Sequence, residues 1–231
     1  MRLTLFGAHG GTGLHLTRQA LAAGHTVVAV TRRPGEFPIS DTRLTVAKAD
    51  VNDPEEVAAA VAGADAVLSA LGVPFTRRPV TIYSLGTANI VAAMERHSVK
   101  RIVVITSVST DPHPHAEAGF LMNKVLQPLV NATIGRTTYA DMRLLEAALR
   151  ATDLDWTVVR PAGLYDADRV TAYRLEEDRT DGFRTSRADL AAAVLAQVDT
   201  TEWVHRNVAV TTTDGAPSLL QLMFGEALAR R

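Results

Sequence analysis

Apolar residues along the chain fall into short runs that alternate with longer stretches of helical periodicity. The runs are rich in Val, Leu and Ile, which is typical of strands buried on both faces of a sheet. In the first helical stretch Leu14, Thr17 and Leu21 recur on one stripe, and Gly24 marks its end. We expect strands within Leu3–Phe6, His25–Thr31, Leu44–Ala49, Ala66–Leu71, Arg101–Ser107, Trp156–Arg160 and Val204–Thr211, and helices within Thr12–Ala23, Pro54–Ala62, Val80–His97, Thr138–Thr152, Ser186–Val198 and Pro217–Arg230.

This alternation predicts parallel βαβ units with right-handed crossovers, and hence helices on both faces of one sheet. The expected fold class is α/β, a doubly wound parallel sheet of the Rossmann type, in a single domain over residues 1–231. Residues 162–187 and 212–231 are expected to form a small substrate-facing cap. The charged stretch Arg169–Arg187 is either part of that cap or a solvated excursion. The apolar stretch Ala118–Ile134 either lines a pocket or partner groove, or forms a short helix packed on the sheet.

A glycine-rich turn follows the first strand and opens the first helix. Glycines at this place permit a tight turn and let the backbone approach a pyrophosphate, while the helix N-terminus offers free N–H groups. The spacing is Gly-x-x-Gly-x-x-Gly rather than Gly-x-Gly-x-x-Gly. Its place in a βαβ unit nevertheless predicts dinucleotide binding, with cofactor contacts from Gly7, Gly10, Gly11, Thr12, Gly13 and Leu14.

The end of the second strand carries the chemistry that separates NAD from NADP. An acidic residue there would accept a hydrogen bond from the ribose 2′-hydroxyl of NAD. This chain instead has Arg32 and Arg33, and its next acidic residue is Glu36. Two guanidinium groups suit a 2′-phosphate. The alternative is that one arginine is solvated and the other only stacks on adenine. The sequence therefore favours NADP(H) as the cofactor.

Composition excludes several other functions. The 231 residues carry 24 Lys and Arg against 25 Asp and Glu, a net charge of −1, which argues against a nucleic-acid partner. No cysteine is present, so thiolate metal sites, disulfides and a Cys nucleophile are ruled out. The longest apolar run, Leu190–Ala196, is far short of the ~20 residues of a membrane helix. With no signal peptide recognised, we expect a cytoplasmic monomer or small homo-oligomer acting on a small molecule.

Further motifs resemble atypical short-chain dehydrogenase/reductases, in particular the NAD(P)-binding group of NmrA-like and biliverdin reductase B/flavin reductase-like proteins. The resemblance covers about residues 2–210 and implies the same fold and cofactor binding. It implies adenine contacts from Asp50 and Val51, and a cofactor-backing strand end at Ala70, Leu71 and Gly72. The matching segments are Ala49–Val51, Ser69–Gly72, Gly86–Met94, Val99–Ser107, Leu154–Pro161 and Ser186–Ala191, and the nicotinamide side is implied at Thr106, Ser107, Arg160 and Pro161.

Typical members of this family use a Ser and a Tyr-x-x-x-Lys pair. Ser107 fits the serine place, and Ser109 is an alternative on the same face if the strand continues. Tyr139 and Arg143 have the spacing of the pair, with Arg in place of Lys. However, the family places a glutamate four residues after the lysine, and taking Glu146 as that glutamate assigns the lysine place to Met142 and the tyrosine place to Thr138. Tyr139 is then about 100° away around the helix.

Two functions remain open because the usual acid pair is degraded or absent. The first is an NADP(H)-dependent oxidoreductase passing hydride to an acceptor that needs little acid help, such as a flavin, quinone or tetrapyrrole, or to a carbonyl. Its catalytic candidates are Ser107 and Tyr139. The second is an NADP(H)-binding redox sensor of the NmrA type. His113, His115 and Glu117 lie close together, but the proline-broken segment favours a solvated loop over a metal site, and no hydrolase motif is present.

Overall fold

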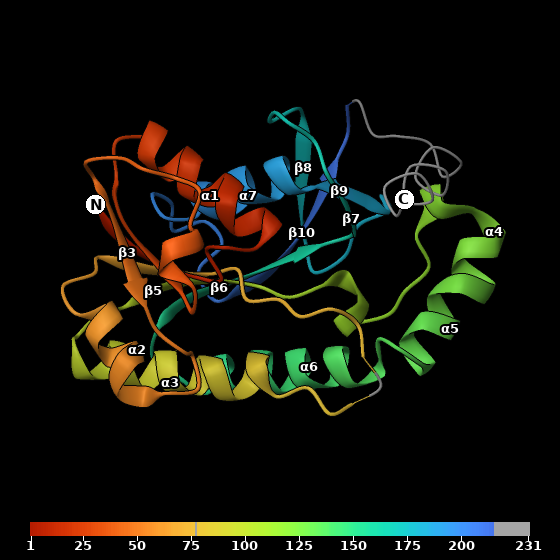
Figure 1. Cartoon of the computed structure of the whole chain (residues 1–231). Helices are drawn as coiled ribbons and strands as arrows, with labels where there is room; N and C mark the ends of the chain where they lie inside the picture. Colours follow the sequence, from red (N-terminus) through yellow and green to blue (C-terminus); the bar gives the residue numbers. More distant parts are fainter. Residues whose placement is uncertain (77, 215–231) are drawn as a thin grey trace.

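An eight-stranded sheet forms the centre of the computed structural model, which describes residues 1–76 and 78–214 (Figure 1). Seven of its strands run parallel and the last is antiparallel. In sheet order the strands are β3 (Leu44–Lys48), β2 (Thr26–Thr31), β1 (Arg2–Phe6), β4 (Ala66–Ser69), β5 (Arg101–Ile105), β6 (Asp155–Pro161), β10 (Arg206–Thr212) and β8 (Tyr173–Glu177).

The sheet order reverses direction at β1, as in doubly wound dinucleotide-binding folds. From β1 the chain winds outward through β2 to β3, and then crosses to the other side of β1 for β4, β5 and β6. A crevice opens at such a reversal because the connection after β1 runs to one side, towards β2, and the connection after its neighbour β4 runs to the other side, towards β5. The predicted fold class is confirmed.

Helices cover both faces of the sheet (Figure 1). Each face has its own core, since successive strand residues point to opposite sides: Leu3 and Leu5 belong to one core, and Phe6 to the other. One face carries α1 (Gly11–Ala22) and α7 (Arg187–Ala196), and the other carries α2 (Pro54–Val61), α3 (Ile82–Arg96) and α6 (Arg136–Arg150).

Helix starts follow local capping chemistry in two clear cases. Asp53 precedes Pro54, and its Oδ1 accepts hydrogen bonds from the N–H groups of Glu55 and Glu56, at 3.0 and 3.1 Å. Ser186 likewise accepts from the N–H of Asp189, at 3.0 Å, at the start of α7.

The charged stretch Arg169–Arg187 is not a solvated excursion, because it contains two strands. Strand β8 pairs antiparallel with β10 at the end of the main sheet. Its Tyr173 and Leu175 pack against the core, while Arg174 and Glu176 form a salt bridge at 3.0 Å. A second, two-stranded sheet joins β7 (Gly163–Tyr165) and β9 (Arg184–Ser186). An edge strand with charged outward positions mimics a solvated loop in sequence.

The stretch Ala118–Ile134 lies away from the sheet (Figure 1). It forms α4 (Gly119–Leu121), a π-helical turn (Met122–Leu126) and α5 (Gln127–Ala132). Phe120 is 78% exposed, whereas Val130 packs against the core. No residue of this stretch is among the described residues that line the cleft. The expected helix Pro217–Arg230, and most of the expected cap at 212–231, lie outside the described residues. Within residues 1–76 and 78–214, no helix has the length and apolar character needed to cross a membrane.

Candidate functional site

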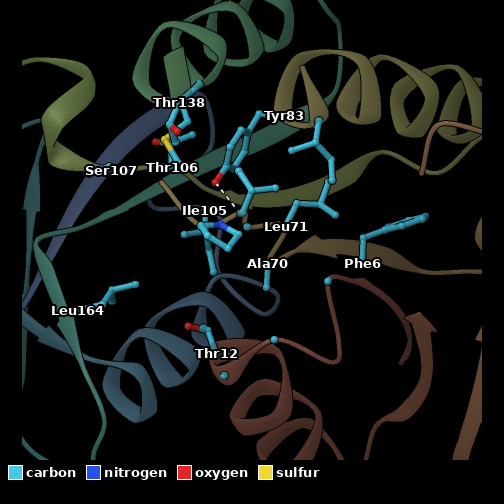
Figure 2. A pocket seen from close by; sticks show the side chains of 18 of the residues that line it. Phe6, Thr12, Ala70, Leu71, Tyr83, Ile105, Thr106, Ser107, Thr138 and Leu164 are labelled. Atoms are coloured by element: carbon cyan, nitrogen blue, oxygen red, sulfur yellow. Dashed lines mark hydrogen bonds between the residues drawn. The ribbon is translucent and has the colours of Figure 1, made fainter. Parts of the chain in front are cut away.

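A cleft of about 890 Å³ lies at the carboxyl ends of β1, β2, β4 and β5, where the sheet order reverses. This volume is in the upper part of the range of about 300–1,000 Å³ that is typical of ligand sites. Figure 2 shows Thr106, Ser107 and Thr138 gathered on one side of the cleft, across from Thr12. The cleft lining includes most of the residues predicted to bind cofactor: Gly7, Gly10, Gly11, Thr12, Arg32, Arg33, Asp50, Val51, Ala70, Leu71, Gly72, Thr106 and Pro161.

Backbone crowding explains the glycines of the turn. Gly7 has φ +74°, and a Cβ there would lie 2.3 Å from the Ala70 carbonyl oxygen. A Cβ on Gly13 would lie 2.2 Å from the Gly7 oxygen, so Gly13 lets α1 pack directly onto the turn. Gly13 and Leu14 do not themselves line the cleft. Gly13 instead allows close packing of α1 on the turn, and Leu14 makes the first backbone hydrogen bond of the helix.

The start of α1 offers the donors that a pyrophosphate needs. Gly10 is the N-cap and has no side chain to accept from the first-turn N–H groups. The first backbone bond of the helix joins the Leu14 N–H to the Gly10 carbonyl at 2.9 Å. Beside this helix end, a Cβ on Gly10 would find only the Gly7 oxygen, at 3.3 Å, which leaves space for a ligand. The turn therefore fits a dinucleotide phosphate.

The end of β2 carries the two exposed guanidinium groups of Arg32 and Arg33. Arg33 pairs with Glu36 at 2.8 Å, but both side chains are more than half exposed, so the pair is weak and easily exchanged. Nearby, Asp50 Oδ1 accepts from the backbone and side-chain nitrogens of Asn52, each at 2.9 Å. These bonds fix the Asp50 carboxylate at the mouth of the cleft.

Tyr139 reaches the cleft together with Ser107 and Ser109. Burial raises the pKa of Tyr139 above its ordinary value, while hydrogen bonds with Ser109 and Ser107 oppose that rise. Strand β5 ends at Ile105, two residues earlier than expected, and Ser107 caps a 3₁₀ turn at Val108–Thr110 by accepting from the Ser109 N–H at 3.2 Å. This turn, rather than strand alternation, brings both serines to the cleft.

Gly135 makes room for the Tyr139 ring. A Cβ on Gly135 would lie 2.5 Å from Tyr139 Cε2, closer than such contacts allow. The exposed ring of Phe75 also meets the Tyr139 ring edge-on, with centroids 5.8 Å apart. The Tyr139 ring therefore has close contacts with both Gly135 and Phe75.

The helical register of α6 places Thr138, Tyr139 and Met142 on the cleft. Sequence reasoning assigned Thr138 and Met142 to the tyrosine and lysine places and left Tyr139 a residue out of register, yet all three line the cleft. Arg143 does not, and its Nη1 donates to the Thr110 carbonyl at 3.3 Å. Among the described residues that line the cleft, the cations are Arg32, Arg33 and Arg187, none of them on α6. Tyr139 therefore has no lysine-like neighbour in the cleft lining.

Glu146 and Arg160 form a buried ion pair behind the cleft, 3% and 4% exposed. Arg160 Nη2 and Nε donate to the two carboxylate oxygens of Glu146 at 2.5 and 3.1 Å. Thr106 and Thr110 donate to Glu146 Oε1 at 2.8 and 3.1 Å. One carboxylate thus joins α6 to β6 and to both ends of the Ser107 segment. Arg160, expected near the nicotinamide, instead positions the scaffold, and its neighbour Pro161 lines the cleft.

His113 and His115 are occupied by backbone hydrogen bonds. His113 Nε2 and His115 Nδ1 both contact the Thr180 carbonyl, at 3.2 and 3.0 Å. Burial lowers the pKa of His115, which favours a neutral ring that donates through Nδ1. Glu117 instead lies 3.9 Å from Arg174. These contacts tie the 113–117 segment to β8 and its following turn.

Sequence reasoning missed several residues that line the cleft, namely Phe75, Tyr83 and Arg187. Tyr83 is buried, which raises its pKa, and its hydroxyl accepts from the Val73 N–H at 3.3 Å (Figure 2). Phe75 and Tyr83 lie in or beside the connection from β4 to α3. Arg187 begins α7 and comes from a distant part of the chain. No spacing pattern in the sequence joins these positions to the glycine turn.

Comparisons with known proteins agree with this geometry. A family model described as NAD(P)H-binding matches residues 7–201. An uncharacterised chloroplastic protein of Arabidopsis thaliana is 30% identical over 170 residues, which are 68% of this chain and 57% of that protein, so the chain spans little more than half of that relative. A UPF0659 protein of Schizosaccharomyces pombe is 25% identical, with 96% of this chain and 93% of that protein covered.

Solved structures share the fold at lower identity. A short-chain dehydrogenase/reductase from Veillonella parvula in complex with NADP has a TM-score of 0.77 and 20% identity, covering 94% of this chain and 99% of that one. The anaerobillin reductase ChuY from Escherichia coli O157:H7 has a TM-score of 0.72 and 22% identity, covering 94% of this chain and 100% of that one. At these identities the likeness concerns the fold alone.

Proposed function

Because the chain belongs to the NAD(P)H-binding family, we propose that it is an NADP(H)-dependent oxidoreductase that transfers hydride to a small acceptor. The observation that carries this proposal is the composition of one cleft. Its lining joins a glycine turn at a helix N-terminus, a pair of arginines at the end of β2, and the Ser107, Ser109 and Tyr139 hydroxyls. A bound nicotinamide would supply the hydride.

The preference for the 2′-phosphate rests on Arg32 and Arg33. Each guanidinium can bind phosphate as a charged fork, and the exposed pair of Arg33 with Glu36 costs little to exchange. The carboxylate of Asp50 lies on the adjacent strand end, suited to the adenine side. The Veillonella parvula structure of the same fold holds NADP. Gly7, Gly10, Gly11 and Thr12 would hold the pyrophosphate.

The acceptor end of the cleft is lined by hydroxyl groups and apolar side chains. Ser107 and Tyr139 would hold an acceptor oxygen by hydrogen bonds, with Ala70, Leu71, Gly72, Thr106 and Pro161 backing the nicotinamide side. Met142 and Leu164 add apolar surface that limits water. Positioning of the acceptor against the cofactor is then the main catalytic contribution of the protein.

The acceptor class follows from the acid chemistry. A lysine next to a tyrosine lowers its pKa and strengthens it as an acid, whereas burial here raises the pKa of Tyr139. A flavin, a quinone or a linear tetrapyrrole needs little acid help, since its extended conjugated system spreads the charge that hydride brings. Tyr139 or water then supplies the proton. A simple carbonyl would depend more strongly on Tyr139.

A screen of flavins, quinones, linear tetrapyrroles and aldehydes for NADPH oxidation tests this proposal. We expect turnover with at least one conjugated acceptor and slower turnover with aldehydes. Ser107→Ala is expected to lower the acceptor rate while leaving NADPH affinity within about twofold, because its hydroxyl faces the acceptor end. Absence of turnover with every acceptor would contradict the proposal.

A second candidate function is a redox sensor that binds NADP(H) and does not turn it over. The raised pKa of Tyr139 and the lack of a lysine-like neighbour in the described cleft lining favour it. A sensor requires that one redox form bind more tightly, because only differential affinity shifts a conformational equilibrium. If the protein turns over no acceptor, the affinities of NADPH and NADP⁺ are compared. A clear difference between the two affinities would support the sensor.

A further inference from the structure

Arg187 is far from the glycine turn in the sequence but lies against it in the structure. It is the first residue of α7, directly after the Ser186 cap. A Cβ on Gly11 would lie 2.8 Å from Arg187 Cδ and 3.0 Å from its Nε. Both Gly11 and Arg187 line the cleft. The absence of a side chain at Gly11 therefore lets the arginine cross the start of α1.

The charges around the cleft are unevenly distributed. Of the cations in its described lining, Arg32 and Arg33 follow β2, and Arg187 alone lies beside the glycine turn. The segment from Gly7 to Leu14 contains no Lys or Arg. The N-terminus of a helix supplies only about half a unit of positive charge. A dinucleotide pyrophosphate carries about two negative charges, which the N-terminus of α1 neutralises only in part. A cation at this position would neutralise more of that charge.

The Arg187 guanidinium is held in place but remains available. Its Nη1 pairs with Asp166 Oδ1 at 2.9 Å, and the Asp166 side chain is 86% exposed. An ion pair with so exposed a partner adds little stability and is readily exchanged for a phosphate. The Arg187 side chain itself is 29% exposed. Packing against Gly11 thus fixes the stem while solvent can reach the charged end.

We propose that Arg187 binds the pyrophosphate of the dinucleotide and is a cofactor-binding residue of this chain. The inference rests on dinucleotide occupancy of the cleft as part of the proposed function, but it does not depend on the preference for NADP(H). Asp166 follows β7, whose Gly163 and Leu164 also line the cleft. If Arg187 left Asp166 to bind the phosphate, cofactor binding would therefore release a contact of the β7 segment at the acceptor end of the cleft.

Calorimetric titration of Arg187→Gln with NADPH and NADH tests this role without any acceptor. We expect both affinities to fall by the same factor, about tenfold or more, because both ligands carry the pyrophosphate. The factor should shrink at high salt, since screening weakens the lost charge contact in the wild type. Arg187→Lys should keep part of the affinity. An unchanged NADPH affinity in Arg187→Gln would overturn the proposal.

Asp166→Asn is the matched control, since it breaks the same ion pair and leaves the cation. We expect its NADPH affinity to stay within about twofold of the wild type. Equal weakening by Asp166→Asn and Arg187→Gln would show that the ion pair acts only structurally, and would overturn the role of Arg187. A wild type that binds NADPH and NADH equally contradicts the NADP preference alone, because the Arg187 effect is expected on both ligands.

Discussion

Tyr139 carries a hydroxyl whose pKa is raised by burial, and it lines the cleft together with Ser107 and Ser109. A raised pKa preserves the neutral, proton-donating form above the ordinary value near 10. The direction of the pKa shift matters for the pH dependence of the rate. A tyrosine whose pKa is lowered by a lysine would lose its proton at lower pH, and the rate would fall at that lower pH. In the proposed oxidoreductase, Tyr139 would be a weak proton donor that stays protonated across the whole neutral range.

Tyr139→Phe is expected to slow carbonyl reduction by about 10² and reduction of a conjugated acceptor by less than about threefold. The Tyr139-dependent part of the rate should stay level from neutral pH to about pH 10 and fall only above it. Steady-state rates of wild type and variant across this pH range check both statements. A Tyr139-dependent rate that falls between about pH 7 and pH 9 would contradict the direction of the pKa shift.

Gly135 provides a test that leaves the Tyr139 hydroxyl in the chain. Gly135→Ala puts a methyl group 2.5 Å from the Tyr139 ring, so the ring must move. We expect acceptor reduction to fall about as far as in Tyr139→Phe, with NADPH affinity within about twofold and a loss of about 1–3 kcal/mol in unfolding free energy from overpacking. Gly35→Ala is the control, since a Cβ there meets nothing within 4 Å. Unchanged carbonyl reduction in Gly135→Ala would contradict the contribution of Tyr139.

At the scale of elements, the carboxylate of Glu146 joins several elements behind the cleft. Glu146 of α6 binds Arg160 of β6 as well as Thr106 and Thr110, which flank Ser107. Asp141, also on α6 and buried, accepts from the N–H of Tyr83 at 2.8 Å at the start of α3. Helix α6 therefore fixes both the serine segment and the helix that carries Tyr83.

Arg160→Met should cost about 3–5 kcal/mol of unfolding free energy, because it leaves the Glu146 carboxylate buried without its main partner. Adding Glu146→Gln should recover part of that loss, since the uncompensated charge is then gone. Urea unfolding of the two variants and the wild type measures both changes. A loss below about 1 kcal/mol in Arg160→Met would mean that the pair contributes no more than an exposed salt bridge.

For the whole molecule, local patterns predicted the fold well. The glycine turn and the buried Val- and Leu-rich runs specify a parallel, doubly wound sheet. The match to the NAD(P)H-binding family confirms the predicted cofactor class, and short-chain dehydrogenase/reductase structures share the fold. Strand β8 escaped prediction because Arg174 and Glu176 occupy its outward positions. Its pairing with β10 depends on a distant segment, which a local pattern does not contain.

For the candidate site, too, local patterns predicted the positions near strand ends but not the contacts between distant segments. Residues within three positions of a strand end, such as Arg32, Asp50 and Gly72, could be placed because parallel strands end at one edge. Arg187 was missed since its approach to Gly11 arises from the packing of α7 on α1. Tyr139 reaches the cleft although it is one residue from the expected place, because Gly135 leaves space for its ring. These features depend on tertiary contacts.

Arg32 and Arg33 are proposed to make this protein bind NADP(H) in preference to NAD(H). Titration of the wild type and of the Arg32→Ala/Arg33→Ala double variant with NADPH and NADH measures it directly. We expect the wild type to bind NADPH about tenfold or more tightly than NADH, and the double variant to lose most of that difference while keeping its NADH affinity. Equal affinities in the wild type, or an NADPH preference that survives in the double variant, would contradict the account.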